Sequence, residues 1–235
     1  LRKYESCNQI QKVINEAMNL GDDNDHGHDW HQDVLDRCEL KMRNPISTHW
    51  DEIDSITKGG LGKRELGVVV APTGAGKSMA LAHLGAYAVI KGKTVVHYTL
   101  ELADTVVGQR YDSCITGIEL KNLMSMKDSI VMAIEHIPGK LIIKEYPTKS
   151  ASTRTITGHL EKLRQKGINP DMIIVDYADL LKPTATGFKS QELRHSLGNI
   201  YEELRAIGQT FDIPVWTASQ TNRSGLNAEV ITMES

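Results

Sequence analysis

The hydrophobic positions of residues 65–220 follow two alternating patterns. Short apolar runs have the length and composition of buried β-strands. They lie at residues 65–71, 94–100, 140–146, 171–176 and 213–219. Longer segments between them carry apolar residues at helical spacing. These lie at residues 77–91, 103–116, 120–137, 152–166 and 193–211. The alternation predicts an α/β fold, with a mostly parallel sheet covered by helices on both faces.

The first 45 residues have a different pattern. Apolar residues recur at helical spacing over residues 1–20, and Gly21 ends that predicted helix. A polar, acidic stretch follows at residues 22–29, and a second helix is expected from Asp29 to about Met42. A third, short helix is expected after Ser47 or Thr48. We therefore expect a helical linker over residues 1–45 and a single α/β core over residues 46–235.

Composition and charge narrow the function classes. The chain has 235 residues, and its formal net charge of −3 gives no global basic field for nucleic-acid binding. The three cysteines, Cys7, Cys38 and Cys114, form no close pair, which is typical of reduced thiols in a cytoplasmic compartment. The longest apolar stretch, residues 79–90, is too short to span a bilayer, so no membrane partner is expected.

The segment Ala71-Pro72-Thr73-Gly74-Ala75-Gly76-Lys77-Ser78 follows the first predicted strand and precedes a predicted helix. That context is typical of a phosphate-binding P-loop, although Ala71 replaces the usual first glycine. Glycines let the backbone curl so that successive N–H groups face an anion, and the helix dipole adds to the attraction. The residues expected to bind ATP are Thr73, Gly74, Ala75, Gly76, Lys77, Ser78 and Met79. Lys77 would reach the β- and γ-phosphates, and the Ser78 hydroxyl would ligate Mg²⁺.

Three polar residues stand at the carboxyl ends of other predicted strands, where ligands of open α/β sheets bind. Asp176 ends an apolar run and is expected to support Mg²⁺ opposite Ser78. Glu101 follows the second strand and could polarise the water that attacks the γ-phosphate, or it could be a surface residue at a helix start. Gln220 could hydrogen-bond a γ-phosphate oxygen and sense its presence, or simply cap a strand.

Two polar loops follow strands at the same edge of the predicted sheet. Lys182 and Lys189 lie in the first loop, and Arg223 lies in the second. These side chains are candidates for contact with a DNA backbone, and the alternative is an ordinary solvent-exposed loop. The histidines at 26, 28 and 31 lack a second ligand cluster, so a solvated linker is favoured there over a metal site.

The order of these motifs resembles a known family. Along the chain, the P-loop is followed by Thr99-Leu100-Glu101-Leu102-Ala103, then by Asp176-Tyr177, and then by Ala218-Ser219-Gln220-Thr221-Asn222-Arg223. This order resembles the RecA-like motor domain of DnaB-type hexameric replicative helicases, and especially those of T-even-type tailed phages. Gly27-His28-Asp29, Thr57-Lys58-Gly59-Gly60, residues 141–147 and Val215-Trp216-Thr217-Ala218 are similar to that subgroup. The similarity covers the chain from about Gly21 onward.

The resemblance implies an ATP-driven motor. Such helicases form homo-oligomeric rings, with six subunits as the family expectation, that translocate on single-stranded DNA and unwind the duplex. On the matching positions, Lys77 and Ser78 bind the Mg²⁺–triphosphate, Glu101 activates water and Gln220 links nucleotide state to the DNA loop. The implied sheet order places the Gln220 strand between the P-loop strand and the Asp176 strand, with the Glu101 strand beyond. A primase or a helicase loader is an expected partner, and the cytoplasm of a bacterial host is the expected location.

One part of the family pattern has no counterpart in this sequence. In the family, an arginine finger reaches the ATP site of the adjacent subunit from a position downstream of the sensor strand, whereas this sequence ends at Ser235. The core is therefore expected to be incomplete at its C-terminus. Because an arginine finger is worth about 10³–10⁵ in rate, this chain alone is expected to bind ATP but to hydrolyse it slowly.

Two other functions fit the same motifs. A RecA/RadA/KaiC-like recombinase or regulatory ATPase shares the strand order and the glutamate after the second strand. A helicase releases a strand from a forked duplex, whereas a recombinase pairs homologous strands. A non-catalytic, nucleotide-dependent assembly module would use the apolar stripe of the first helix to dock on a neighbouring subunit. The linker similarity favours the helicase.

Overall fold

The computed structural model describes residues 30–31, 43–183 and 193–221, with the side chains of 193–197 excepted. The chain divides into two compact units, Leu1–Met42 and Arg43–Ser235. Every described helix and strand belongs to the second unit. The helices expected over residues 1–20 and 29–42 lie outside the described residues.

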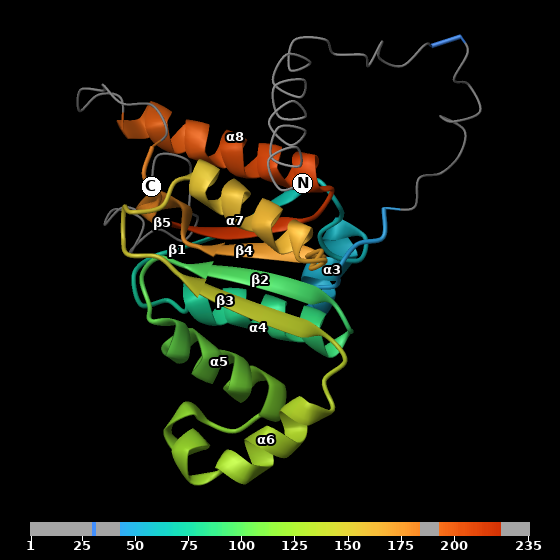
Figure 1. The fold of residues 1–235 in the computed structure, drawn as a ribbon, viewed down its shortest axis with the longest axis vertical. Helices are drawn as coiled ribbons and strands as arrows, with labels where there is room; N and C mark the ends of the chain where they lie inside the picture. The colour runs from blue at the N-terminus through green and yellow to red at the C-terminus, as the bar shows by residue number, and fades with distance from the viewer. Residues whose placement is uncertain (1–29, 32–42, 184–192, 222–235) are drawn as a thin grey trace, which may run out of the picture. The chain divides into compact units, whose positions relative to one another are not determined.

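A five-stranded sheet forms the centre of the second unit (Figure 1). Its strands are β1 (Leu66–Ala71), β2 (Thr94–Thr99), β3 (Lys140–Glu145), β4 (Met172–Asp176) and β5 (Val215–Gln220). Their order across the sheet is β1-β5-β4-β2-β3, and every strand pair is parallel. The predicted order is confirmed, because the Gln220 strand lies between the P-loop strand and the Asp176 strand, and β2 lies beyond.

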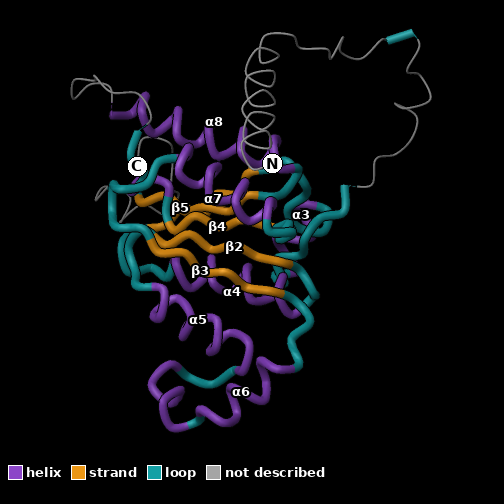
Figure 2. The backbone as a smooth tube through the Cα atoms, viewed as in Figure 1, coloured by secondary structure: helices purple, strands orange, loops and turns teal. Residues whose placement is uncertain are grey.

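Helices cover both faces of the sheet, as predicted (Figures 1 and 2). On one face lie α4 (Lys77–Ile90) and α5 (Asp104–Thr116), and on the other lie α7 (Thr153–Gln165) and α8 (Leu193–Phe211). The expected helical stretch at residues 120–137 is divided into a 3₁₀ helix, η2 (Leu120–Ser125), and α6 (Lys127–Glu135). The short third helix is α3 (Asp51–Thr57). None of the described helices combines the length and the apolar character that a bilayer crossing requires.

Strand β4 shows how the core is divided between the two faces. All five of its residues are buried, and their side chains alternate between the faces because a strand repeats every two residues. Ile173 and Val175 pack in the cluster with α7 and α8, whereas Met172 and Ile174 pack with α4. A strand buried on both faces reads as a continuous apolar run, which is why the sequence predicted it well.

Helices α4 and α5 approach each other closely at a glycine. A Cβ atom added to Gly85 of α4 would lie 2.0 Å from the Tyr111 hydroxyl of α5, so only glycine fits there. Tyr111 is buried, and its hydroxyl lies 3.0 Å from Nδ1 of the buried His97 in β2. Burial, helped by the positive charge of Arg110, lowers the pKa of His97 to about 3, so this histidine is neutral. These contacts fix the rotation of α5 about its own axis.

Candidate nucleotide-binding site

The loop between β1 and α4 has the backbone conformation that an anion-binding loop requires. Gly74 and Gly76 have φ angles of 78° and 94°, in the left-handed region that glycine adopts without a steric penalty. A Cβ atom added at either residue would meet nothing within 4 Å, so the space beside the loop is open. Helix α4 begins directly after Gly76, and its amino end therefore faces this space.

A cavity of about 330 Å³ lies at this loop. Its lining includes eight predicted site residues: Thr73, Gly74, Gly76, Lys77, Ser78, Met79, Glu101 and Gln220. It also includes Leu102 and Arg110, which the sequence analysis did not single out. The predicted Ala75 is not among the lining residues. Chain segments far apart in sequence thus converge on one cavity at the carboxyl edge of the sheet.

The ammonium group of Lys77 lies inside the loop. Lys77 is only 9% exposed, and its Nζ donates hydrogen bonds of 3.0 Å to the carbonyl oxygens of Ala71 and Pro72. It also lies 5.8 Å from the centre of the Tyr177 ring. Lys77 forms no ion pair with a carboxylate in the described part of the chain. A cation held only by neutral carbonyls remains available to a bound anion.

Asp176 is fully buried at the end of β4 and is not among the lining residues of the cavity, but it lies next to Ser78, which is. Among the described residues, neither carboxylate oxygen of Asp176 has a hydrogen-bond partner of good geometry. The Ser78 hydroxyl lies nearby and favours the ionised form of the carboxyl group. Burial raises the pKa of Asp176, and the charge of Glu101 adds to this increase, while Ser78, Arg110 and Lys77 oppose it. Two buried oxygens without partners, next to a serine hydroxyl, are the hard ligands that a divalent cation requires.

Strand register brings Glu101 to the same site. Thr99, the last residue of β2, pairs with Asp176 of β4, so Glu101 stands two residues beyond the sheet edge. Glu101 is exposed and lines the cavity opposite the P-loop. An exposed carboxylate facing a phosphate-binding loop has the placement of a general base, whereas the buried Asp176 has the placement of a metal ligand.

Gln220 joins the loop to the end of β4. Its Nε2 donates a 2.6 Å hydrogen bond to Oγ1 of Thr73, and its Oε1 accepts a 3.2 Å hydrogen bond from the Tyr177 hydroxyl. Its backbone N–H donates to the Asp179 carboxylate, which also accepts from the Tyr201 hydroxyl of α8. A displacement of Thr73 in the P-loop would therefore be transmitted through the Gln220 side chain to Tyr177, the residue after β4.

Arg110 is the functional candidate that the sequence analysis missed. It lies on α5 and lines the same cavity, next to the buried Tyr111 that anchors the helix. Its positive charge lowers the pKa of Asp176, so its guanidinium lies within electrostatic range of the predicted metal site. Within the described part of the chain it forms no ion pair. A half-buried, unpaired guanidinium beside a P-loop is a typical phosphate ligand.

The predicted DNA contacts are only partly within the described residues. Lys182 is exposed and follows the short 3₁₀ helix η3 (Ala178–Leu180) after β4, and its N–H donates to the carbonyl of Ala151. Lys189 and Arg223 lie outside the described residues. Lys182 therefore has a known position at the carboxyl edge of the sheet, and the other two candidates stay predictions.

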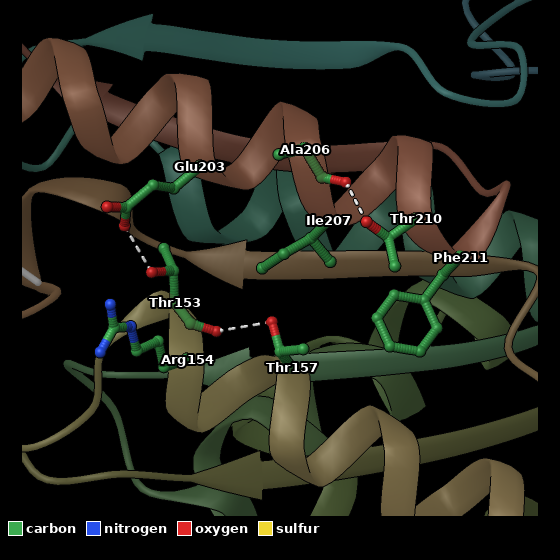
Figure 3. A pocket seen from close by; sticks show the side chains of 8 residues that line it. All are labelled: Thr153, Arg154, Thr157, Glu203, Ala206, Ile207, Thr210 and Phe211. Carbon is green, nitrogen blue, oxygen red and sulfur yellow. Dashed lines mark hydrogen bonds between the residues drawn. The ribbon is translucent and has the colours of Figure 1, made fainter. Parts of the chain in front are cut away.

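A larger groove, of about 430 Å³, lies between α7 and α8, and its lining differs chemically from that of the cavity (Figure 3). The lining residues are Thr153, Arg154, Thr157, Glu203, Ala206, Ile207, Thr210 and Phe211. Its threonine hydroxyls already donate to protein groups, to the carbonyls of Thr153 and Ala206 and to the Glu203 carboxylate. The groove has no glycine-rich loop and no buried unpaired carboxylate, so the smaller cavity is the better candidate site.

Comparison with known proteins shows the family of the chain. Residues 45–229 match the model of the DnaB-like helicase C-terminal domain family. The chain belongs to this family. It is 26% identical over 246 residues to a DnaB-like replicative helicase of Enterobacteria phage T4, covering 99% of this chain and 51% of the relative. The chain thus spans about half the length of the curated relative that it matches.

Two solved structures share the fold of this DnaB-like domain. A solved ATPase domain superposes with a TM-score of 0.67 at 16% identity, covering 83% of this chain and 71% of that one. A DnaB-like replicative helicase, studied with its primase interactions, superposes with a TM-score of 0.69 at 15% identity, covering 97% of this chain and 60% of that one. The predicted RecA-like ATPase fold is confirmed.

Proposed function

We propose that this DnaB-like domain is the ATP-driven motor of a replicative DNA helicase, which couples ATP hydrolysis at subunit interfaces to translocation on single-stranded DNA and duplex unwinding. The observation that carries the proposal is the single cavity where the P-loop, Glu101 and Gln220 meet, with the buried Asp176 next to Ser78. Family membership and the replicative helicases among its relatives support the choice of a helicase over a recombinase.

The residues present fit ATP with Mg²⁺. The N–H groups of the loop and the amino end of α4 would hold the phosphates, and Lys77 would exchange its carbonyl partners for phosphate oxygens. Ser78 and Asp176 would hold Mg²⁺, which neutralises charge on the phosphate oxygens when bound. Glu101 would orient the attacking water and accept its proton.

Gln220 would report the nucleotide state. While its amide binds Thr73 of the P-loop and the Tyr177 hydroxyl, it connects the two strands that end at the site. A γ-phosphate that competes for this amide would release one of those bonds and alter the segment leading to Lys182. The DNA contacts of Lys182, Lys189 and Arg223 would follow from this change.

Assembly and partners belong to the same proposal. A homo-oligomeric ring, with six subunits as the expected number, would bring a neighbouring subunit to the cavity. The arginine finger of the family would reach the cavity from a region downstream of the sensor strand, for which this sequence offers no candidate. The T4 relative and the structural neighbour studied with primase support a replication role, with primase or a helicase loader as a partner in a bacterial host. The expectation of slow hydrolysis by this chain alone stays a prediction.

The proposal is tested by strand release from a forked DNA duplex. We expect the complete protein to release a labelled strand in the presence of ATP and Mg²⁺, and we expect Lys77→Ala to abolish release; this chain alone is expected to unwind poorly. A parallel reaction with homologous single strands and duplex tests for pairing. Homologous pairing without release from the fork would indicate the recombinase instead, and ATP-independent behaviour in both assays would refute a motor.

Arg110 gives a further prediction at the site. Removal of one preorganised donor from a catalytic cavity typically costs about 10²–10³ in turnover, so Arg110→Ala is expected to lower single-turnover ATP hydrolysis about 10²-fold. Arg110→Lys should recover only part of this loss, because an ammonium lacks the planar fork of a guanidinium. Arg154→Ala, in the groove of Figure 3, is the matched control. Equal turnover in Arg110→Ala and the control would exclude a phosphate contact.

A further inference from the structure

A group of basic side chains lies on the opposite face of the sheet from α4 and α5. Lys144 comes from β3, and His159, Lys162 and Lys166 come from α7 and its C-terminal cap. Burial lowers the pKa of His159, and the positive charges of the three lysines lower it further, so each lysine lies within electrostatic range of His159. We call these four residues the basic surface. Strand β3 is the edge of the described sheet (Figure 1). Ile142 of β3 and Tyr146, which follows it, pack against the hydrophobic cluster of α7, so alternate residues of β3, including Lys144, face the side of the sheet that α7 covers.

The spacing on α7 places its three basic groups on one stripe. Residues three and four apart are neighbours on a helix surface, so His159 is adjacent to Lys162, and Lys162 to Lys166. The buried residues Ile156, Leu160 and Leu163 occupy the core face of the same helix. The basic stripe therefore runs along the side of α7 towards its C-terminus, away from the loop that carries Lys182.

Among the described residues, no carboxylate forms an ion pair with the lysines of the basic surface. All three lysines are exposed. Lys144 instead lies 5.3 Å from the centre of the Tyr146 ring. Like charges left together cost free energy, so a bound anion would stabilise them.

The orientation of His159 adds a donor to the basic surface. The hydroxyl of Tyr98 lies 2.9 Å from Nδ1 of His159, and burial raises the pKa of this tyrosine, so the phenol keeps its proton. A phenol that donates to Nδ1 leaves the proton of the neutral imidazole on Nε2. In that tautomer the second ring nitrogen is an N–H donor, on a side chain within electrostatic range of the three lysines.

Two simpler explanations account for only part of the basic surface. Lysines on an edge strand prevent unwanted strand pairing, which would explain Lys144, but Lys162 and Lys166 belong to the helix and its cap. A protein partner would be expected to cover apolar surface, yet none of the exposed large hydrophobic side chains of the described residues lies on β3 or α7. Charge without apolar area fits a phosphate backbone better than a protein interface.

We propose that the basic surface binds the phosphate backbone of single-stranded DNA, separately from the loops at the carboxyl edge of the sheet. The choice of DNA as the polyanion rests on the proposed function. A strand held here passes along the side of α7, so the domain has two separate contacts with nucleic acid, one at the nucleotide-coupled loops and one on the basic surface.

The test is the salt dependence of binding to a fluorescent oligothymidylate of about 20 nucleotides. For single strands each neutralised phosphate contributes about 0.7 to the slope of log affinity against log salt. The triple variant Lys144→Gln/Lys162→Gln/Lys166→Gln is therefore expected to lower that slope by about 2. The matched control is Lys58→Gln/Lys121→Gln/Lys127→Gln, which removes the same charge from exposed lysines elsewhere in the fold. Anisotropy is measured with the full chain between about 50 and 200 mM salt.

The possible outcomes separate this inference from the proposed function. A slope lowered only in the Lys144/Lys162/Lys166 variant supports the basic surface. Equal slopes in both variants and the wild type overturn it while leaving the motor intact. No binding of the oligonucleotide by any of the three proteins contradicts the proposed function as well.

If the triple variant loses affinity only for labelled poly-glutamate, the surface binds an acidic protein segment and the DNA assignment is wrong. Thermal melting of all three proteins controls for folding.

Discussion

Replacement of Glu101 by glutamine is expected to lower single-turnover ATP hydrolysis about 10²–10⁴-fold, the usual contribution of a general base. ATP affinity should change little, because Lys77, the P-loop amides and the pair Ser78 and Asp176 remain. Glutamine keeps the size of the side chain and loses only the ability to accept a proton. Single-turnover conditions with excess protein are chosen because they detect hydrolysis even if turnover by this chain alone is slow.

The positions of the two carboxylates explain why Glu101, and not Asp176, is expected to be the general base. Asp176 is the last residue of β4, and Glu101 lies two residues beyond the end of the neighbouring β2. Asp176 is fully buried, whereas Glu101 is exposed and lines the cavity. Glu135→Gln, an exposed carboxylate of α6, is the matched control. If Glu101→Gln hydrolyses ATP at the wild-type rate, this carboxylate only stabilises the positive end of α5, and the water must be activated by another group.

Most of the sheet could be predicted from the sequence because buried parallel strands are continuous apolar runs with short connections. Strand boundaries were shifted by up to two residues, most clearly at β5, which begins at Val215 rather than residue 213 and includes Gln220. Pro214 lacks an N–H for the strand ladder, which accounts for the later start. The strand order came from the family resemblance, since periodicity alone does not determine which strands pair.

Arg110 could not be found by the same reasoning. Its place in the cavity depends on how α5 is rotated, and that rotation depends on the contact of Tyr111 with Gly85 and His97. A phosphate-binding arginine on a helix has no motif of its own, whereas the P-loop has a fixed spacing and a strand and helix around it. The missing information was tertiary packing.

The basic surface was hidden for a related reason. Its residues come from an edge strand and a helix that share one face of the sheet only in the folded protein. The net charge of −3 excludes a globally basic protein, but it averages over faces and does not exclude a local positive surface. The net charge is compatible with local contacts between basic side chains and DNA. The sequence analysis predicted such contacts only in the two loops that carry Lys182, Lys189 and Arg223.

Lys77→Ala is expected to weaken binding of Mg²⁺–ATP about 10²-fold or more, because hydrogen bonds between charged partners are the strongest in such a site. In the structure Nζ donates to the carbonyls of Ala71 and Pro72, both neutral groups that it can exchange for phosphate oxygens. The variant loses the cation and leaves those carbonyls facing an open cavity that water can reach. The free energy of unfolding without nucleotide should therefore change by only about 1 kcal/mol.

Thermal unfolding measures both effects in one experiment. A ligand at 100 times its Kd stabilises the native state by about 2.7 kcal/mol, so ATP with Mg²⁺ at that concentration should clearly raise the Tm of the wild type. The same concentration is at most about the Kd of Lys77→Ala, so the variant should gain no more than about 0.4 kcal/mol and a much smaller rise of Tm. Lys91→Ala, at the opposite end of α4, is the control and should respond to ATP like the wild type, because Lys91 lies beside Tyr87 rather than the P-loop. An equal rise of Tm in Lys77→Ala would mean that the nucleotide binds without this cation. The cavity at the P-loop would then no longer be the site on which the motor depends, because every other contact proposed there assumes phosphates held at the amino end of α4.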